Sequence, residues 1–130
     1  MGTGYLADTN AAIDYLENKL AETATAFIDN LEMRLSVVPR IELLAWSNIS
    51  PQQHSMLNGF IFASQIYNLS EEIILQTIEM RRKHKIKLPD AIIAATAITQ
   101  NLTLITRSLA DFKKIKDLQL VNPSDNSSFK

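Results

Sequence analysis

The pattern of hydrophobic and polar positions predicts short strands that alternate with helices. Short apolar or β-branched runs, typical of buried strands, occur at 5–7, in "LTLIT" at 102–106 and in "LQLVN" at 118–122. "LSVV" at 35–38 suits either a strand end or the first turn of a helix, because Pro39 follows it. Apolar residues recur every three or four positions in the segments between these runs, which predicts helices from Asn10 to about Leu20 and over 22–33, 41–46 and 51–64.

Two later helices have clear boundary signals. The segment 70–85, "SEEIILQTIEMRRKHK", starts with a capping serine and two acids and ends with basic residues, as the helix dipole favours. The next helix follows Pro89 in "KLPDAIIAATA". Strands that alternate with helices form parallel sheets with helices on both faces. We therefore predict one α/β domain over 1–123, with a central parallel sheet of about four to five short strands, and a flexible polar tail at 124–130.

Composition narrows the kinds of site that are available. The 130 residues contain no cysteine, which rules out disulfides and thiolate metal sites, and the two histidines lack zinc-ligand spacing. A net charge of −1 gives no overall basic excess for nucleic acid. The first ten residues do not resemble a signal peptide, and no apolar run reaches the roughly 18 residues that span a bilayer. We expect a cytoplasmic protein without membrane contact.

Four acids lie at the ends of predicted elements. Asp8 follows the first strand, Glu42 lies in the first turn after "LSVV", Asp111 follows "LTLIT", and Asp90 begins the helix before that strand. Ligands of parallel α/β sheets bind beyond the carboxyl ends of the strands. Two carboxylates 4 Å apart repel by ~4 kcal/mol at an effective dielectric near 20, and a divalent cation removes that repulsion. Oxygen ligands without Cys or His favour Mg²⁺ or Mn²⁺.

Each acid also has a purely structural interpretation. Asp8 and Asp90 are good helix caps, Glu42 suits an exposed first turn, and Asp111 can stabilise the turn before Phe112. Spacing alone does not decide between these roles and a metal site. The other acids of the first half are expected on solvated helix faces: Asp14, Glu17, Glu22, Asp29 and Glu32.

Four segments together resemble the PIN domain family, and in particular the VapC-type toxins of bacterial toxin–antitoxin pairs. They are "YLADTNAAID", "LSVVPRIELL", "KLPDAIIAATA" and "LTLITRSLADF", in the order and rough spacing of that family, and the likeness runs from about Tyr5 to Pro123. The resemblance implies a Mg²⁺- or Mn²⁺-dependent endoribonuclease that hydrolyses RNA through a metal-activated water. It makes Asp8, Glu42, Asp90 and Asp111 the catalytic and metal-binding acids.

The resemblance also assigns supporting roles. Thr9 would support Asp8 by hydrogen bonding, and Thr106 and Ser108 would line the same end of the sheet. Three positions depart from the family pattern: Ser108 stands where Asn is usual, Pro39 replaces Ser or Thr, and Arg40 is an unusual charge. A hydroxyl binds a metal less firmly than an amide or carboxylate, so occupancy of a second metal position stays open.

Basic runs flank two of these acids and suit a phosphate backbone. "RRKHKIK" at 81–87 leads to Asp90, and "KKIK" at 113–116 follows Asp111. The first run has an alternative role as the charged end of a helix. The residues expected to bind RNA are Arg40, Arg81, Arg82, Lys83, Lys85, Lys87, Arg107, Lys113 and Lys114.

An apolar middle region is expected to belong mostly to the core. It contains Trp46, Met56, Leu57, Phe60, Ile61 and Phe62. The resemblance implies that its helices form a homodimer face and a groove for an antitoxin. A catalytically inactive PIN-like scaffold remains the alternative, as does a related phosphatase or DNA exonuclease with the same metal chemistry.

Overall fold

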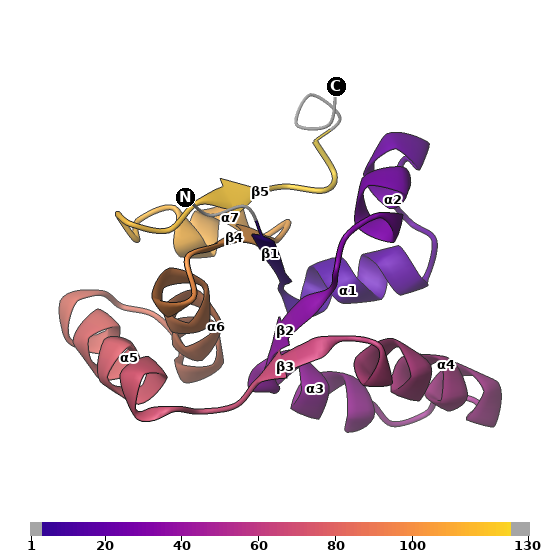
Figure 1. Cartoon of the computed structure of the whole chain (residues 1–130), viewed down its shortest axis with the longest axis horizontal. Coiled ribbons are helices and arrows are strands. Elements are labelled where there is room, and N and C mark those ends of the chain that lie inside the picture. The colour runs from indigo at the N-terminus through magenta and orange to yellow at the C-terminus, as the bar shows by residue number, and fades with distance from the viewer. Residues whose placement is uncertain (1–3, 126–130) are drawn as a thin grey trace.

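Five short parallel strands form the central sheet, in the order β3-β2-β1-β4-β5 (Figure 1). The structure, a computed structural model, describes residues 4–125. The strands are β1 (Gly4–Ala7), β2 (Arg34–Ser36), β3 (Gln65–Tyr67), β4 (Leu102–Ile105) and β5 (Leu120–Val121). The helices are α1 (Thr9–Leu16), α2 (Glu22–Asp29), α3 (Val37–Leu44), α4 (Pro51–Phe62), α5 (Glu71–Lys83), α6 (Leu88–Thr99) and α7 (Leu109–Phe112).

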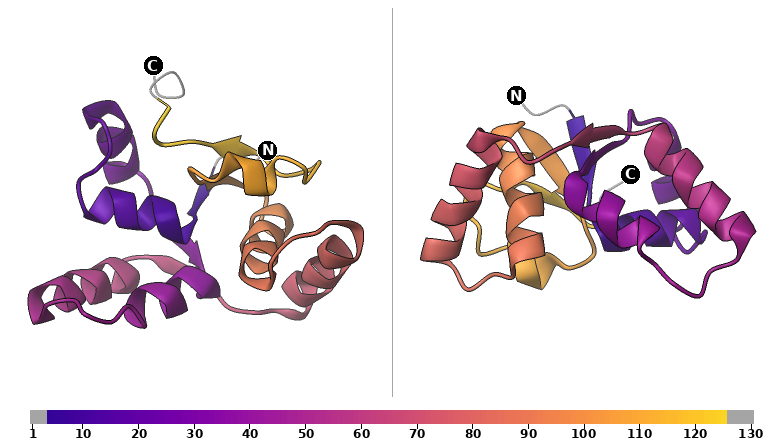
Figure 2. Two further views of the ribbon diagram at one scale, coloured as in Figure 1. Left: turned by 180° about the vertical axis from the view of Figure 1, so that it is seen from behind. Right: turned by 90° about the horizontal axis from the view of Figure 1, so that it is seen from below.

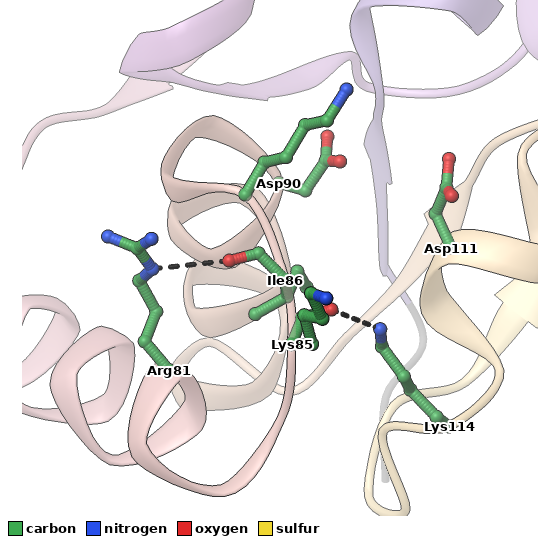
Figure 3. Close-up of a pocket in the computed structure, with 7 residues that line it drawn as sticks. Arg81, Lys85, Ile86, Asp90, Asp111 and Lys114 are labelled. Carbon is green, nitrogen blue, oxygen red and sulfur yellow. Dashed lines mark hydrogen bonds between the residues drawn. The ribbon is translucent and has the colours of Figure 1, made fainter.

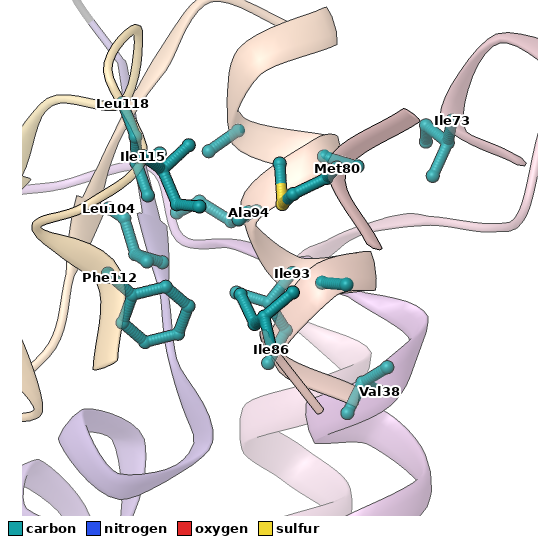
Figure 4. Close-up of a cluster of buried hydrophobic side chains, with 14 residues drawn as sticks. Val38, Ile73, Met80, Ile86, Ile93, Ala94, Leu104, Phe112, Ile115 and Leu118 are labelled. Carbon is teal, nitrogen blue, oxygen red and sulfur yellow. The ribbon is translucent and has the colours of Figure 1, made fainter. Parts of the chain in front are cut away.

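Helices cover both faces of the sheet, so each face has its own hydrophobic core (Figure 2). Successive side chains of a strand point to opposite faces, and β1 shows this directly. Leu6 joins the core under α5, α6 and α7, whereas Ala7 joins the core under α1, α3 and α4. The small residues of α6 allow that helix to pack closely between α5 and the sheet (Figure 4). The two cores hold the strand ends in fixed positions.

The predicted fold class is confirmed. The strands at 5–7, 102–106 and 118–122 and the six predicted helices appear in the predicted order, although α1 ends at Leu16 and α2 at Asp29, earlier than expected. Strand β3 had no specific prediction, because Gln65–Tyr67 is too short to show an alternating pattern. Serine side chains cap α3, α4 and α5 as N-caps.

Some predicted segments lie partly outside the described residues or are less buried than expected. Of the predicted tail at 124–130, residues 126–130 lie outside the described part of the chain. In the described range, no helix has the length and apolar character needed to cross a membrane. The apolar middle region is less buried than expected: Leu57 and Ile61 belong to the core, whereas Trp46, Met56 and Phe62 are exposed.

Candidate active site

Asp8 lies between β1 and α1, at the carboxyl end of the central strand. Its Oδ1 accepts a hydrogen bond from the backbone N–H of Thr9 at 2.8 Å, so Asp8 is the N-cap of α1. Its Oδ2 accepts from Thr106 Oγ1 at 2.8 Å and from Asn10 Nδ2 at 3.1 Å. Thr106 directly follows β4, the neighbour of β1. The capping role is therefore real, and the same contacts fix a buried carboxylate in one orientation.

Glu42 approaches the same end of the sheet from α3. The hydroxyl of Thr9 donates to Glu42 Oε1 at 2.5 Å. Thr9 thus contacts two acids, Asp8 through its backbone N–H and Glu42 through its side chain. The resemblance predicts that Thr9 supports Asp8, but it does not predict the hydrogen bond from Thr9 to Glu42. Glu42 is otherwise exposed, which leaves its second oxygen accessible.

Asp90 is in the first turn of α6 and does not cap it. The helix begins at Leu88, three residues earlier than the capping interpretation requires, and its N-cap residue is Lys87. The carboxylate of Asp90 accepts no hydrogen bond in the part of the chain that the structure describes, although Asp90 is partly buried. Asp111 lies in α7 and is exposed. The two carboxylates point toward the same side of a shared cavity (Figure 3).

The four acids interact electrostatically. Burial raises the pKa of Asp8, and the charges of Asp90 and Glu42 raise it further, while hydrogen bonds from Thr106 and Thr9 oppose the shift. Burial also raises the pKa of Asp90, with Asp111 and Glu42 adding to the shift and Lys87 opposing it. The fold therefore brings all four acids to one end of the sheet, where Asp90 and Glu42 disfavour the charge of Asp8, and Asp111 and Glu42 disfavour the charge of Asp90.

The donor set fits a hydrated hard cation. Within residues 4–125, no three His, Cys, Asp or Glu side chains are close enough to form a complete metal cage. Mg²⁺ does not require such a cage, because it keeps several waters and is usually bound through one or two carboxylates. Asp8 and Asp90 provide these oxygens, and a cation would offset both the burial and the acidic neighbours that raise the pKa of each carboxyl.

Asn10 is a site residue that the sequence analysis missed. Its Nδ2 donates to Asp8 Oδ2 at 3.1 Å and to Ser108 Oγ at 2.9 Å, and its Oδ1 accepts from the Arg107 backbone N–H at 3.3 Å. Asn10 therefore joins the first turn of α1 to the loop after β4. A polar residue two positions after Asp8 was the available signal. Ser108 contacts Asn10, as a residue lining this end would.

Asp14 differs from its prediction. It was expected on a solvated face, but it is only 4% exposed and accepts two hydrogen bonds from Arg107 Nη1, at 2.7 and 2.8 Å. A carboxylate buried to this extent needs a charged partner. The guanidinium of Arg107, expected to bind RNA, is thus engaged by Asp14.

Two adjoining cavities contain these acids. The central cavity, of about 420 Å³, is lined by Asp8, Glu42 and Asp90 together with Thr9, Asn10 and Ser108. The basic cavity, of about 380 Å³, shares Asp90 with it and also contains Asp111. Its cationic side chains are Arg81, Lys85, Lys87 and Lys114 (Figure 3). Arg81 Nε donates to the Ile86 carbonyl and Lys114 Nζ to the Lys85 carbonyl, which holds the loop before α6 in place.

The other predicted RNA-binding residues lie elsewhere. Arg40 lines a separate groove between α3 and α4, beside Leu44 and Phe62, and does not reach the acids. Arg82, Lys83 and Lys113 are exposed and line neither the central nor the basic cavity. Lys83 instead lies 4.0 Å from Glu79 on its own helix. The positive charge near the acids comes mainly from the loop before α6 and from Lys114.

The fold and the acidic cavity define an α/β protein with an oxygen-donor site at the carboxyl ends of parallel strands. The sequence model of the PIN domain matches residues 5–118, and the chain belongs to the PIN domain family. No curated protein matches the sequence closely enough to count as a relative.

Solved structures confirm the resemblance to VapC-type toxins. A chain of a toxin–antitoxin complex from Klebsiella pneumoniae is 30% identical, with a TM-score of 0.75, 92% of this chain and 98% of that chain being covered. A chain of VapBC2 from Rickettsia felis, bound to a promoter DNA fragment, is 25% identical with a TM-score of 0.79, covering 91% and 97%. DNA-bound VapBC from Salmonella typhimurium shares the fold at 21% identity and a TM-score of 0.81, covering 93% and 98%.

Proposed function

We propose that this chain is a Mg²⁺- or Mn²⁺-dependent endoribonuclease, the toxin component of a VapBC-type toxin–antitoxin pair. The main observation is that four acids from separate elements gather at one end of the sheet and repel one another. The basic cavity beside them supplies charge for a phosphate backbone. Membership of the PIN domain family supports a nuclease activity.

In this proposal Asp8 and Asp90 hold the metal, Glu42 is a ligand or orients the attacking water, and Asp111 is the outermost acid. A bound divalent ion supplies an activated water and stabilises charge on the phosphate oxygens. The chain's own residues do the positioning: Thr106 and Asn10 orient Asp8, and Thr9 orients Glu42. Hydrolysis would break the P–O bond to the leaving ribose oxygen and form a new P–O bond to the water oxygen, and a proton from the water would end on the leaving oxygen.

RNA phosphates next to the cleaved bond would bind in the basic cavity. Lys85, Lys87 and Lys114 line it together with Arg81, and Asp90 connects it to the central cavity. Neutralising contacts of this kind position a backbone without reading its sequence. RNA degradation would place the protein in the cytoplasm.

We also propose an antitoxin partner and a homodimer. The relative from Klebsiella pneumoniae is a toxin–antitoxin complex, which supports an inhibitory protein partner. Exposed apolar side chains on α3 and α4, such as Ile41 and Phe62, offer surface for such contacts.

A catalytically weak scaffold is the second candidate. Two observations favour it: the described residues form no complete metal cage, and Ser108 supplies only a hydroxyl where the family has Asn. A scaffold would keep the fold and the basic cavity but would neither cleave RNA nor bind Mg²⁺.

The two candidates differ in the behaviour of Asp90→Asn. We expect wild-type protein with Mg²⁺ or Mn²⁺ to cleave single-stranded RNA, and the variant to lose activity by more than about 100-fold, since even outer-shell changes at metal sites cost up to that much. Asp117→Asn is the matched control, because Asp117 is exposed and lies outside both cavities. Full activity of Asp90→Asn would remove Asp90 from the mechanism, and an inactive wild type without metal binding would favour the scaffold.

A further inference from the structure

A third, apolar cavity adjoins the central one. It has a volume of about 280 Å³, and its apolar lining is Ile13, Leu16, Trp46, Met56 and Leu57. Ile13 and Trp46 also line the central cavity. The apolar cavity therefore lies directly beside the carboxylate site, and Ile13 and Trp46 form part of both.

The three cavities lie next to one another and together mark a path across the site, because each shares lining residues with the next. Asp90 joins the basic cavity to the central one, and Ile13 and Trp46 join the central cavity to the apolar one. A ligand that follows this path meets cations, then carboxylates, then an aromatic and aliphatic surface. A single nucleic-acid strand has matching chemistry, because it carries charged phosphates and flat aromatic bases on one backbone.

Trp46 is suited to contact a base. It follows the C-cap of α3 and is 38% exposed, although its indole is a large apolar group. In the described part of the chain, its ring stacks on no other aromatic ring. Single-stranded RNA is commonly bound by stacking unpaired bases on such side chains. Glu17 and Gln53 add polar atoms to the same cavity, to which a base edge can hydrogen-bond.

We propose that the apolar cavity is a nucleobase subsite, in which Trp46 stacks on a base of the RNA strand whose phosphate lies in the central cavity. This inference rests on the proposed ribonuclease function and adds a specificity element to it. We assign the occupant to RNA because the apolar cavity lies beside the central cavity, where the phosphate of the same strand would bind near Asp8 and Asp90. Trp46 acts in binding and takes no part in the bond-breaking step.

The first test uses the fact that Trp46 is the sole tryptophan of the chain. Its emission is measured in wild-type protein with Mg²⁺, directly after short single-stranded oligo(A), oligo(C) or oligo(U) RNA is mixed in. Inorganic polyphosphate at equal phosphate concentration is the control, because it has the charge of a backbone but no bases. We expect at least one RNA to quench or shift the emission and polyphosphate to leave it unchanged.

The second test is kinetic. Trp46→Ala should raise KM for RNA about 10-fold, within the range that loss of one base–aromatic stack produces, while kcat changes little. Trp46→Phe retains a ring and should stay near wild type. Met56→Glu, at an exposed position of the same cavity, should raise KM similarly by placing a charge against the base. Leu75→Ala is the control, because it shortens an exposed apolar side chain of α5 that lines none of the three cavities. It should change neither KM nor kcat.

The outcomes separate the subsite from the catalytic proposal. Suppose that wild type cleaves RNA, that RNA leaves Trp46 emission unchanged, and that both Trp46→Ala and Met56→Glu cleave normally. The subsite proposal is then wrong, and the nuclease proposal stands. If RNA is bound with a Trp46 signal but not cleaved, the subsite stands and the nuclease fails. Absence of both binding and cleavage overturns both. A Trp46 signal that appears only on adding an antitoxin would assign the cavity to a protein partner and overturn the subsite.

Discussion

Asp8 and Asp90 differ in how far hydrogen bonds compensate the burial of their charge. Asp8 stabilises α1 as its N-cap and is held by Thr106, so its burial is compensated by hydrogen bonds. Asp90 has no such compensation, and its neighbours Asp111 and Glu42 repel it. A residue that is costly to the fold in its charged form is a reasonable candidate for a functional role.

The charge of Asp90 should make its replacement stabilising in the absence of metal. Its folded-state pKa is raised, so the folded chain loses stability as pH rises from the unfolded value, about 3.9, through the folded value. In EDTA, Asp90→Asn should exceed wild type in free energy of unfolding by a few tenths to about 1 kcal/mol at neutral pH, the range for partly exposed charge pairs. Urea unfolding at several pH values measures this.

The difference between variant and wild type should shrink to near zero below about pH 3.9, where the aspartate is protonated in both folded and unfolded chains. A stability difference that does not depend on pH would contradict the electrostatic explanation, because the gain in free energy of unfolding would then reflect packing rather than charge.

Asn10 is expected to act through Asp8. Asn10→Ala removes the bonds to Asp8, Ser108 and the Arg107 backbone, so the carboxylate and the loop after β4 lose a common anchor. We expect RNA cleavage to fall about 10- to 100-fold, as for outer-shell residues of metal sites, with a higher Mg²⁺ concentration needed for half-maximal rate. Titrating Mg²⁺ in the cleavage assay measures both effects. Unchanged Mg²⁺ dependence would limit Asn10 to a structural role.

At the scale of elements, the loop after β4 is attached to α1 by the ion pair between the buried Asp14 and the half-exposed Arg107. The carboxylate is 4% exposed, and the guanidinium reaches it from the solvent side. Together with Asn10, this pair fixes the relative position of α1 and the segment that contains Thr106 and Ser108. Helix α1 and the loop after β4 are distant in sequence, and these contacts therefore hold their polar groups in fixed positions relative to each other.

Removing this pair should cost stability. Asp14→Asn replaces a buried charge-assisted interaction with a neutral one, which is expected to lower the free energy of unfolding by about 1–3 kcal/mol. Chemical denaturation monitored by circular dichroism measures the loss. The control is Glu22→Gln, an exposed acid of α2, which should stay within about 0.5 kcal/mol of wild type. Equal stability of both variants would show that the pair contributes little.

For the whole molecule, the central cavity is formed only when both cores are in place. Asp8, Glu42, Asp90 and Asp111 come from four segments, and no two of these are neighbours in sequence. A metal that binds there can stabilise only the folded chain. Metal binding and global unfolding are therefore linked.

Mg²⁺ or Mn²⁺ should raise the melting temperature of wild type. At a concentration 100 times Kd the gain is about 2.7 kcal/mol. Asp90→Asn should lose most of this gain, and Asp117→Asn should retain it. Thermal unfolding with EDTA, Mg²⁺ or Mn²⁺ measures the effect. If neither ion stabilised wild type, the carboxylates would not form a metal site, and the scaffold alternative would gain support.

Sequence and structure agree best where the pattern is local. The helix that starts after Ser70 has its cap, acids and basic end within one segment, and the structure places α5 there with Ser70 as N-cap. The short strand β3 gave no such signal, because its pairing with β2 is a tertiary contact. The capping interpretation of Asp90 failed for a similar reason: α6 starts at Leu88, a choice that local preference did not determine.

By itself the sequence determined the order of strands and helices, the α/β class and the set of acids available to the site, because periodicity, caps and residue chemistry are properties of short segments. Tertiary structure decided which polar groups meet. It buried Asp14 against Arg107, turned Arg40 toward another groove, brought Asn10 to Asp8 and left Trp46 beside the carboxylates. These outcomes depend on how helices pack on the two faces of the sheet, and such distances are set by contacts between residues far apart in the chain.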